Sequence, residues 1–215
     1  MLSRLRNFLT TVNRVIIREL VEEERDKVVA FLLTLTEHDR YWRFCRPMTD
    51  DAIRAYAARM DWETTVVFGA FDVRAQLIGI LELCDNGDAA EIAVAVVPAH
   101  RGQGVGRALM DRALLKAKVQ GKERVMLTCL VENESMRRLA RKVGLDATVE
   151  RGEVEGTLAL EDARPEELIE DAAHELMSSV TYAGALYTRS WAELFERLMA
   201  APAHLLAPGD AALPG

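Results

Sequence analysis

The stretch Glu91-Ile-Ala-Val-Ala-Val-Val-Pro-Ala-His-Arg-Gly-Gln-Gly-Val-Gly-Arg-Ala-Leu-Met110 decides how this chain folds. From Ile92 to Val96 large apolar residues alternate with alanine, which is the pattern of a β-strand, and Pro98 ends it. Glycines then occupy every second position of a turn, and from Val105 onward apolar residues recur at helical spacing. The stretch is therefore a strand, a glycine-rich turn and the start of a helix.

Such a turn favours an anion. A helix that begins on it directs several unpaired backbone N–H groups at one point, and the helix dipole makes that point attractive to negative charge. Gly102, Gln103 and Gly104 are compact enough to bring the backbone close to a ligand. The turn therefore predicts a phosphate-binding cradle, with an ordinary strand-to-helix connection as the plain alternative.

The spacing of the glycines differs from the two common nucleotide motifs. A Walker loop needs Gly-Lys-Ser/Thr after four intervening residues, and the sequence has no such run. A dinucleotide fingerprint needs Gly-x-Gly-x-x-Gly, whereas Gly102, Gly104 and Gly106 alternate. The turn instead resembles the Arg/Gln-x-x-Gly-x-Gly/Ala signature of the GNAT superfamily of N-acetyltransferases. The resemblance implies acetyl-CoA as cofactor and assigns its pyrophosphate to Arg101, Gly102, Gln103, Gly104, Val105, Gly106 and Arg107.

Composition narrows the class of protein. The chain has 215 residues, half of them apolar, which is enough to bury a full core. Its net charge of −7 argues against nucleic acid as a partner and is compatible with a cationic substrate. Three cysteines without metal-ligand spacing predict no metal site and favour a reducing, cytoplasmic location. No apolar run reaches the length of a membrane span, so no membrane partner is expected.

The rest of the chain predicts strands and helices around this stretch. Upstream we expect a strand at Val12–Leu20, a helix at Glu22–His38, a second helix from the N-cap Thr49 to about Met60, a hairpin of Thr64–Phe71 and Gln76–Leu83, and a loop at Asp85–Asp88. Downstream we expect the cradle helix to end near Gly121, a strand at Arg124–Val131, a helix at Asn133–Val143 closed by Gly144, and a hairpin of Val149 with Val154–Leu160.

This order indicates an α/β (α+β) fold with a mixed central β-sheet flanked by helices. It is also the order of elements in GNAT enzymes, and the resemblance covers Val12 to Asp162. We therefore expect a GNAT-like acetyltransferase domain at residues 12–162, a helical C-terminal extension at 163–200 and a disordered tail at 201–215. Met1–Thr10 lacks the long apolar region of a signal peptide and is interpreted as a short leader helix or a frayed end.

The C-terminal extension carries an apolar stripe. Tyr187, Trp191, Leu194, Phe195 and Leu198 recur at helical spacing, so they share one face of a helix. The simplest interpretation is that this face packs on its own domain. A homodimer contact and a lid over the substrate cleft are the alternatives.

Acetyl transfer to an amine needs a neutral amine, a stabilised carbonyl oxygen and a thiolate that can leave. A lysine amine has a pKa of about 10.4, so at neutral pH a general base must remove its proton. Glu91 is the candidate base, because it begins the strand before the cradle and shares a face with Ala93 and Ala95 by alternation. The run Ala90-Glu-Ile-Ala-Val94 also resembles the Ala-Glu-Phe/Ile-Ala-Val run of bacterial protein lysine acetyltransferases. The alternative is a strand-end carboxylate that faces water.

The resemblance assigns the rest of the cofactor site. In GNAT folds this strand splays from its neighbour, so that the backbone of Val94, Ala95 and Val96 lines the thioester, pairs with pantetheine and stabilises the oxyanion. Asn133 matches the asparagine that binds the cofactor arm, although helix capping would also explain it. One position departs from the family, because the tyrosine that protonates the thiolate in many members is Ala140 here. The thiolate then leaves unassisted or with a proton from water, or activity has been lost.

Two further runs resemble the protein lysine acetyltransferase branch. They are Asn133–Leu145, in a branch that often lacks that tyrosine, and Arg40-Tyr-Trp-Arg-Phe44, which the resemblance places in a loop that borders the acceptor site. Core packing is the plain alternative for the aromatic residues. The resemblance implies an acetyl-CoA-dependent N-acetyltransferase with a protein lysine as acceptor. A polyamine, amino acid or antibiotic acceptor stays open, as does a degenerate domain that senses acetyl-CoA and regulates a partner.

Overall fold

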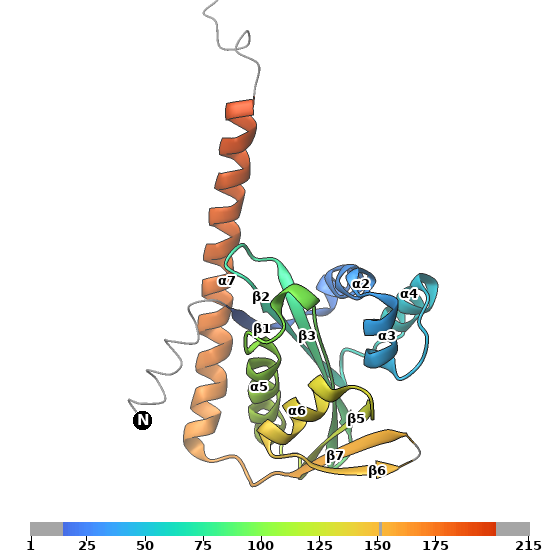
Figure 1. Ribbon diagram of the computed structural model, residues 1–215. Coiled ribbons are helices and arrows are strands. Elements are labelled where there is room, and N and C mark those ends of the chain that lie inside the picture. Colours follow the sequence, from blue (N-terminus) through green and yellow to red (C-terminus); the bar gives the residue numbers. More distant parts are fainter. Residues whose placement is uncertain (1–14, 151, 201–215) are drawn as a thin grey trace, which may run out of the picture.

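The computed structural model describes residues 15–150 and 152–200, whose helices surround one mixed sheet (Figure 1). In chain order the elements are β1 (Ile16–Leu20), the 3-10 turn η1 (Glu22–Glu24), α2 (Arg25–Thr34), α3 (Glu37–Phe44), α4 (Asp50–Ala58), β2 (Thr65–Phe71), β3 (Leu77–Asn86), β4 (Ala89–Val96), the 3-10 turn η2 (Pro98–His100), α5 (Val105–Val119), β5 (Arg124–Leu130), α6 (Glu134–Val143), β6 (Asp146–Glu150), β7 (Glu153–Ala159) and α7 (Pro165–Ala200). The expectations for Met1–Thr10, for the start of the first strand at 12–14 and for the tail at 201–215 lie outside the described residues.

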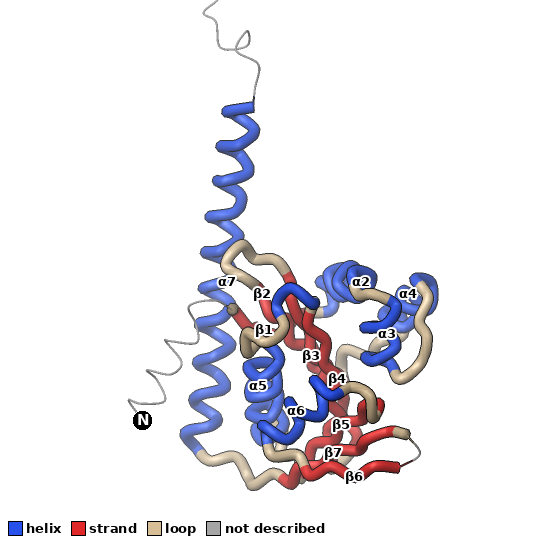
Figure 2. The backbone as a smooth tube through the Cα atoms, viewed as in Figure 1, coloured by secondary structure: helices blue, strands red, loops and turns tan. Residues whose placement is uncertain are grey.

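The sheet has the order β1-β2-β3-β4-β5-β7-β6, and its neighbours run antiparallel except for β4 and β5 (Figure 2). That parallel pair is short, because Ala89–Glu91 pairs with Arg124–Met126 and the described residues beyond them form no further pairs. The mixed sheet predicted from the sequence is confirmed. Beyond Glu91 the two strands separate, which leaves the β5-facing edge of β4 open from Ile92 to Val96.

Strand alternation sends side chains into two cores, one on each face of the sheet. Phe68 and Leu81 pack with Leu109 of α5 on one face, where α6 also lies. Their neighbours Val67 and Ile80 face the other way and pack with residues of α2 and α4. Figure 1 shows α5 and α6 on one side of the sheet and α2, α3 and α4 on the other.

The helix expected at Glu22–His38 is divided in the structure. α2 ends at Thr34, and Thr36 then caps a new helix by accepting the N–H of Asp39 at 3.1 Å. The run Arg40–Phe44 therefore lies on α3 and not in a loop, so three α-helices precede β2 where two were expected. The start of α4 is confirmed, because Thr49 accepts the N–H of Ala52 at 3.2 Å.

The loop expected at Asp85–Asp88 is a tight turn instead. β3 runs to Asn86 and β4 begins at Ala89, so only Gly87 and Asp88 connect the two strands. Gly87 has a φ of 68°, a left-handed conformation that glycine adopts without strain. The turn fixes the register of the hairpin, and with it the residues of β3 that lie beside the open part of β4.

α7 lies against β1 and α5, and its second half extends beyond the rest of the molecule (Figure 1). Asp171 pairs with Arg112 of α5, and Tyr182 is buried against Phe71 with ring centroids 4.5 Å apart. Beyond Tyr182 the apolar stripe is exposed, with Tyr187 at 66% and Trp191 at 55%. The expectation that this face packs on its own domain is therefore wrong, because the helix extends beyond the sheet it lies on (Figure 1). The side chain of Leu198 lies outside the described part.

Within residues 15–150 and 152–200, no helix combines the length and the apolar composition that crossing a bilayer requires.

A charged cluster joins β1, η1, α2 and α7. Arg18 forms hydrogen bonds of 2.7 and 2.5 Å with Glu24, and its guanidinium lies 4.0 Å from the ring centre of Tyr182. Lys27 pairs with the same carboxylate at 2.5 Å. Burial of Glu24 raises the pKa of its carboxyl, but hydrogen bonds from the two cations outweigh burial and lower that pKa from 4.5 to about 2. The cluster therefore stabilises the ionised form of Glu24.

Glu24→Gln should remove stability that depends on pH. Because the folded-state pKa lies below the unfolded value, the cluster stabilises the fold above about pH 4.5 and loses this effect as pH falls toward 2. Thermal denaturation at pH 7 should therefore give a lower midpoint for Glu24→Gln than for wild type, and this difference should shrink from about pH 5 to pH 3. The exposed neighbour Glu23→Gln is the matched control. A difference that stays constant over this range would contradict the assignment.

Candidate active site

The site begins at the open edge of β4. The N–H of Val97 donates to the carbonyl of Ile78 on β3 at 3.0 Å, so the odd-numbered residues along β4 are the ones that bond with β3. The backbone groups of Val94 and Val96 consequently face the opposite side, where β5 has separated. An edge of this kind binds an extended chain through main-chain hydrogen bonds.

A groove of about 370 Å³ runs from this edge to the glycine turn, bordered by α3, α5 and α6. It brings together most of the predicted cofactor-binding residues: Val94, Ala95, Val96, Arg101, Gly102, Gly104, Val105, Gly106, Arg107 and Asn133. Gln103 is the exception among them. Its amide donates to the carbonyl of Ala99 at 2.9 Å, and its side chain lines a second cavity beside His100.

The three glycines of the turn are required for two different reasons. Gly102 and Gly104 are left-handed, with φ of 72° and 87°, and a Cβ added there would meet no atom within 4 Å, so their role is conformational. A Cβ on Gly106 would lie 3.3 Å from Leu139, so this glycine allows α6 to pack closely on α5. α5 begins directly after Gly104, and the N–H groups of its first turn have no partner within the helix. The geometry suits an anion.

The groove is cationic in a chain that is acidic as a whole. Its lining includes one acid, Asp39, and five basic residues, which are Arg43, Arg101, Arg107, Arg138 and Lys142. Arg101 is already engaged, because its Nη2 pairs with Asp39 at 2.7 Å and its Nε donates to the carbonyl of Val96 at 2.9 Å. It therefore ties the turn to α3 and β4. Arg107 and Arg138 form exposed pairs with Asp111 and Glu134, which lie outside the lining, so the lining itself keeps an excess of basic residues that favours an anionic ligand.

Asn133 and Ala140 both lie on the α6 segment. The side-chain oxygen of Asn133 accepts the N–H of Met136 at 3.0 Å, so the residue caps α6 and also lines the groove. Its amide nitrogen is a separate donor. Ala140 lies on the inner face of α6 and is buried in the core that α6 shares with α5. Neither this position nor any other described lining residue of the groove provides a tyrosine.

Glu91 lies where β4 and β5 separate. It is the last residue of β4 that pairs with β5, opposite Met126, and its side chain is exposed. Ala93 and Ala95 lie half-buried on the same face, in agreement with strand alternation. The first residue of β4 that lines the groove is Val94, which comes three residues after Glu91 and lies about 10 Å from it along the strand. Glu91 thus stands beside the open edge and outside the groove itself.

A buried acid on the same face was missed by sequence reasoning. Glu82 lies opposite Ala93 in the β3–β4 ladder and is 1% exposed. It accepts a hydrogen bond from the Tyr56 hydroxyl and pairs with Arg43 at 2.6 Å, while its Oε1 has no hydrogen-bond partner. Burial raises the pKa of the Tyr56 hydroxyl, and the charge of Glu82 adds to this effect. The available signal was a single acid, next to the last residue of the otherwise apolar run Leu77–Leu83.

Two ion pairs fix α3 between the glycine turn and the sheet. Asp39 and Arg43 are four residues apart, so they lie on the same face of α3. Asp39 pairs with Arg101 of the turn, and Arg43 pairs with Glu82 of β3. α3 is therefore tied both to the glycine turn and to the sheet.

Cys45, which follows α3, is half-buried. Burial raises the pKa of its thiol, and the charges of Glu153 and Glu91 raise it further, whereas the charge of Arg43 lowers it. The site thus has a cationic lining at the turn and the exposed carboxylate of Glu91 where β4 leaves β5, and we call the position of Glu91 the acidic side. Within the described ranges, no three His, Cys, Asp or Glu side chains gather as a metal ion would require.

This sequence matches a known protein family, and its fold is similar to those of solved structures. The family model described as "Acetyltransferase (GNAT) family" matches residues 20–145. The chain is similar to the GNAT domain of S. lividans PAT, with 22% identity over 67% of this chain and 89% of that one and a TM-score of 0.59. It is also similar to spermidine N-acetyltransferase from Vibrio cholerae, solved in complex with CoA and spermine, with 19% identity over 67% of this chain and 95% of that one and a TM-score of 0.54. A GNAT-family acetyltransferase from Streptococcus pneumoniae shares 17% identity over 68% of this chain and 99% of that one, with a TM-score of 0.55. These likenesses show a common fold.

Glu82→Gln should destabilise the protein strongly, because it leaves the buried charge of Arg43 without its partner. Removing one member of a buried pair costs about 3–5 kcal/mol, so urea unfolding should show a loss of that order. The double variant Glu82→Leu/Arg43→Met leaves no unpaired charge and should recover part of the loss. Glu134→Gln, which breaks the exposed pair with Arg138, is the control and should cost less than about 1 kcal/mol. A Glu82→Gln loss no larger than that of the control would contradict this account.

Proposed function

The chain belongs to the acetyltransferase (GNAT) family, and from that premise we propose that it transfers the acetyl group of acetyl-CoA to the side-chain amine of a protein lysine. As a member of this family, the chain is an N-acetyltransferase that uses acetyl-CoA. The acceptor and the roles of single residues are proposals. These proposals rest on the open edge of β4, which lies between the cationic glycine turn and the exposed carboxylate of Glu91.

The residues of the groove fit acetyl-CoA. Gly102 and Gly104 leave the backbone of the turn uncovered by side chains, and the first turn of α5 supplies N–H donors for a pyrophosphate. The backbone of Val94 and Val96 would pair with the pantetheine arm, and an N–H group there would stabilise the thioester oxygen as it gains charge. The amide of Asn133 would donate to the same arm. Arg101 would act by positioning the turn, because its guanidinium already binds Asp39 and Val96.

Glu91 is proposed as the general base. Its exposed carboxylate lies on the face that it shares with Ala93 and Ala95, whose small side chains leave room for an amine. The base takes a proton from the amine, directly or through water, so that the nitrogen can attack the thioester carbon. A C–N bond forms, the C–S bond breaks and the thiolate leaves. A thiol pKa of about 8.5 allows it to leave without a tyrosine at position 140.

The charge of the site favours a cationic acceptor. Glu91 carries an exposed negative charge beside the open edge, whereas Glu82 on the same face of the sheet is already paired with Arg43. A small free amine is usually held in a concave pocket that encloses it. Neither the groove nor the second cavity includes Glu91, whose exposed position instead suits a lysine presented by a large partner. The likeness to a spermidine N-acetyltransferase supports a polyamine as the second candidate.

Turnover should depend on Glu91. With acetyl-CoA and a lysine-containing protein, Glu91→Gln should lower kcat by about 10²–10⁴-fold, because the amine stays protonated for longer. The Kd for acetyl-CoA should stay at the wild-type value, since Glu91 lies outside the groove. Glu123→Gln, an exposed acid before β5, is the matched control. Full thiol release by Glu91→Gln would remove it as the base.

The acceptor class is tested by comparing kcat/KM for lysine-containing proteins with kcat/KM for spermidine and free amino acids. A protein lysine should be preferred at least tenfold if the exposed acidic side selects a large partner. A preference for spermidine would replace the protein acceptor with a polyamine. Tight acetyl-CoA binding without thiol release on any acceptor would support a sensing domain.

Gly104→Asp should abolish acetyl-CoA binding, because it adds a carboxylate where the pyrophosphate is proposed to bind. Gly87→Asp is the matched control, since Gly87 is also left-handed and open to solvent but lies at the β3–β4 turn. Both variants carry a similar backbone strain, so isothermal titration separates strain from loss of the site. Unchanged affinity in folded Gly104→Asp would contradict the phosphate cradle.

A further inference from the structure

The outward face of α7 is apolar along most of its length. At 100° per residue, the positions between residues 169 and 195 that fall within one arc of about 100° include no charged residue. The large apolar members of this arc are 46–72% exposed, and we call them the outer stripe: Ile169, Leu176, Met177, Val180, Tyr187, Trp191, Leu194 and Phe195.

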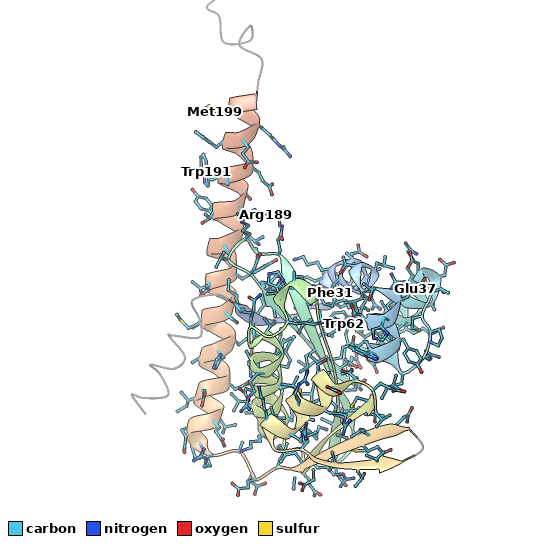
Figure 3. The ribbon with its side chains drawn as sticks, viewed as in Figure 1. Phe31, Glu37, Trp62, Arg189, Trp191 and Met199 are labelled. Atoms are coloured by element: carbon cyan, nitrogen blue, oxygen red, sulfur yellow. The ribbon has the colours of Figure 1, made fainter. Side chains whose placement is uncertain are left out.

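The inner face of α7 holds the helix on the molecule. Asp171 pairs with Arg112 and Lys116, and Tyr182 packs against Phe71 and Arg18. These anchors lie about 180° around the helix from the outer stripe. Figure 3 shows Trp191 on the side that faces away from the sheet, whereas Arg189 lies on the other side. From residue 186 onward, the described side chains of α7 are all exposed.

The charge of α7 argues against a membrane surface as the occupant. Residues 165–200 contain seven acidic residues and two arginines, with no lysine. A helix that lies on a membrane carries lysine and arginine on its polar face, because the headgroups are often anionic. A protein surface is therefore the better match for the outer stripe.

The exposed area is that of a protein interface. Eight large side chains, each about half to three-quarters exposed, present on the order of 1,000 Å². A standard interface buries about 800 Å² on each partner, so the stripe alone is large enough for a stable complex.

We propose that α7 forms a homodimer interface in which two copies of the helix pack antiparallel, with the two-fold axis level with residues 185 and 186. In this register the stripe is complementary to itself, because large residues face smaller ones. Gly184 faces Tyr187, and Val180 faces Trp191. Met177 then faces Leu194. A parallel pairing would instead place each glycine opposite glycine and each tryptophan opposite tryptophan, and would bring the acidic N-terminal ends together.

The register also gives the overhang of α7 a partner. Residues 186–200 of one copy lie along residues 171–185 of the other, so the exposed half of each helix covers the anchored half of its partner. Each sheet lies behind its own helix, on the face opposite the stripe, and the two sheets point away from each other. The arrangement is closed by a two-fold axis, so it ends at two copies.

Light scattering coupled to gel filtration tests the interface. The native chain should have twice its 24.0 kDa mass at micromolar concentration. Tyr187→Glu should raise the dimer Kd at least 100-fold and give monomers, because it places a charge at the centre of the stripe. Ala192→Glu, exposed on the flank of the same helix, should leave the dimer intact. A monomeric native chain, or a Tyr187→Glu dimer as stable as the native one, would overturn the proposal.

Cysteine cross-linking tests the direction of the helices. Met177→Cys and Leu194→Cys, mixed and oxidised, should form a mixed disulfide, because these positions face each other in the antiparallel register. Neither variant should cross-link with itself, since its two copies would lie about 25 Å apart along the helices. The native chain, whose three cysteines lie outside α7, is the control. Self-linked single variants without the mixed product would show parallel helices and overturn the arrangement.

Discussion

The parallel pairing of β4 with β5 ends after three residue pairs, and the rest of the site depends on where it ends. Backbone N–H and carbonyl groups that leave a ladder need new partners, so the freed edge at Val94 and Val96 is a ready binding surface. α5 follows β4 and α6 follows β5, so the separation of the strands also separates the starts of these helices. The glycine turn and Asn133 therefore flank the opening and line one groove.

α3 connects the two sides of this opening. Asp39 binds Arg101 on the cationic side, and Arg43 binds the buried Glu82 on the other. Each pair neutralises a charge that would otherwise act on the ligands. Toward the turn the lining still includes Lys142 together with Arg107 and Arg138, whose own partners Asp111 and Glu134 lie outside the lining, and Glu91 is exposed on the acidic side. The charges left over thus match an anionic cofactor at one end and a cationic amine at the other.

Some parts of the site could be predicted from the sequence because their causes are local. Left-handed glycines at 102 and 104, the Thr49 cap and the face that Glu91 shares with Ala93 each follow from a few adjacent residues. Other parts could not, because their partners lie far away along the chain. Arg43 meets Glu82, and Thr36 divides a helix that apolar spacing alone would continue.

α7 shows the same division. The residues of α7 that share a face can be predicted from the amino-acid sequence, because a helix repeats every 3.6 residues whatever surrounds it. The face that turns inward depends on contacts with other elements: Asp171 pairs with Arg112, Tyr182 packs against Phe71, and the outer stripe is exposed. The physical reason is range, since helical periodicity arises from hydrogen bonds four residues apart, whereas the orientation of a helix is set by contacts with segments that only folding brings near.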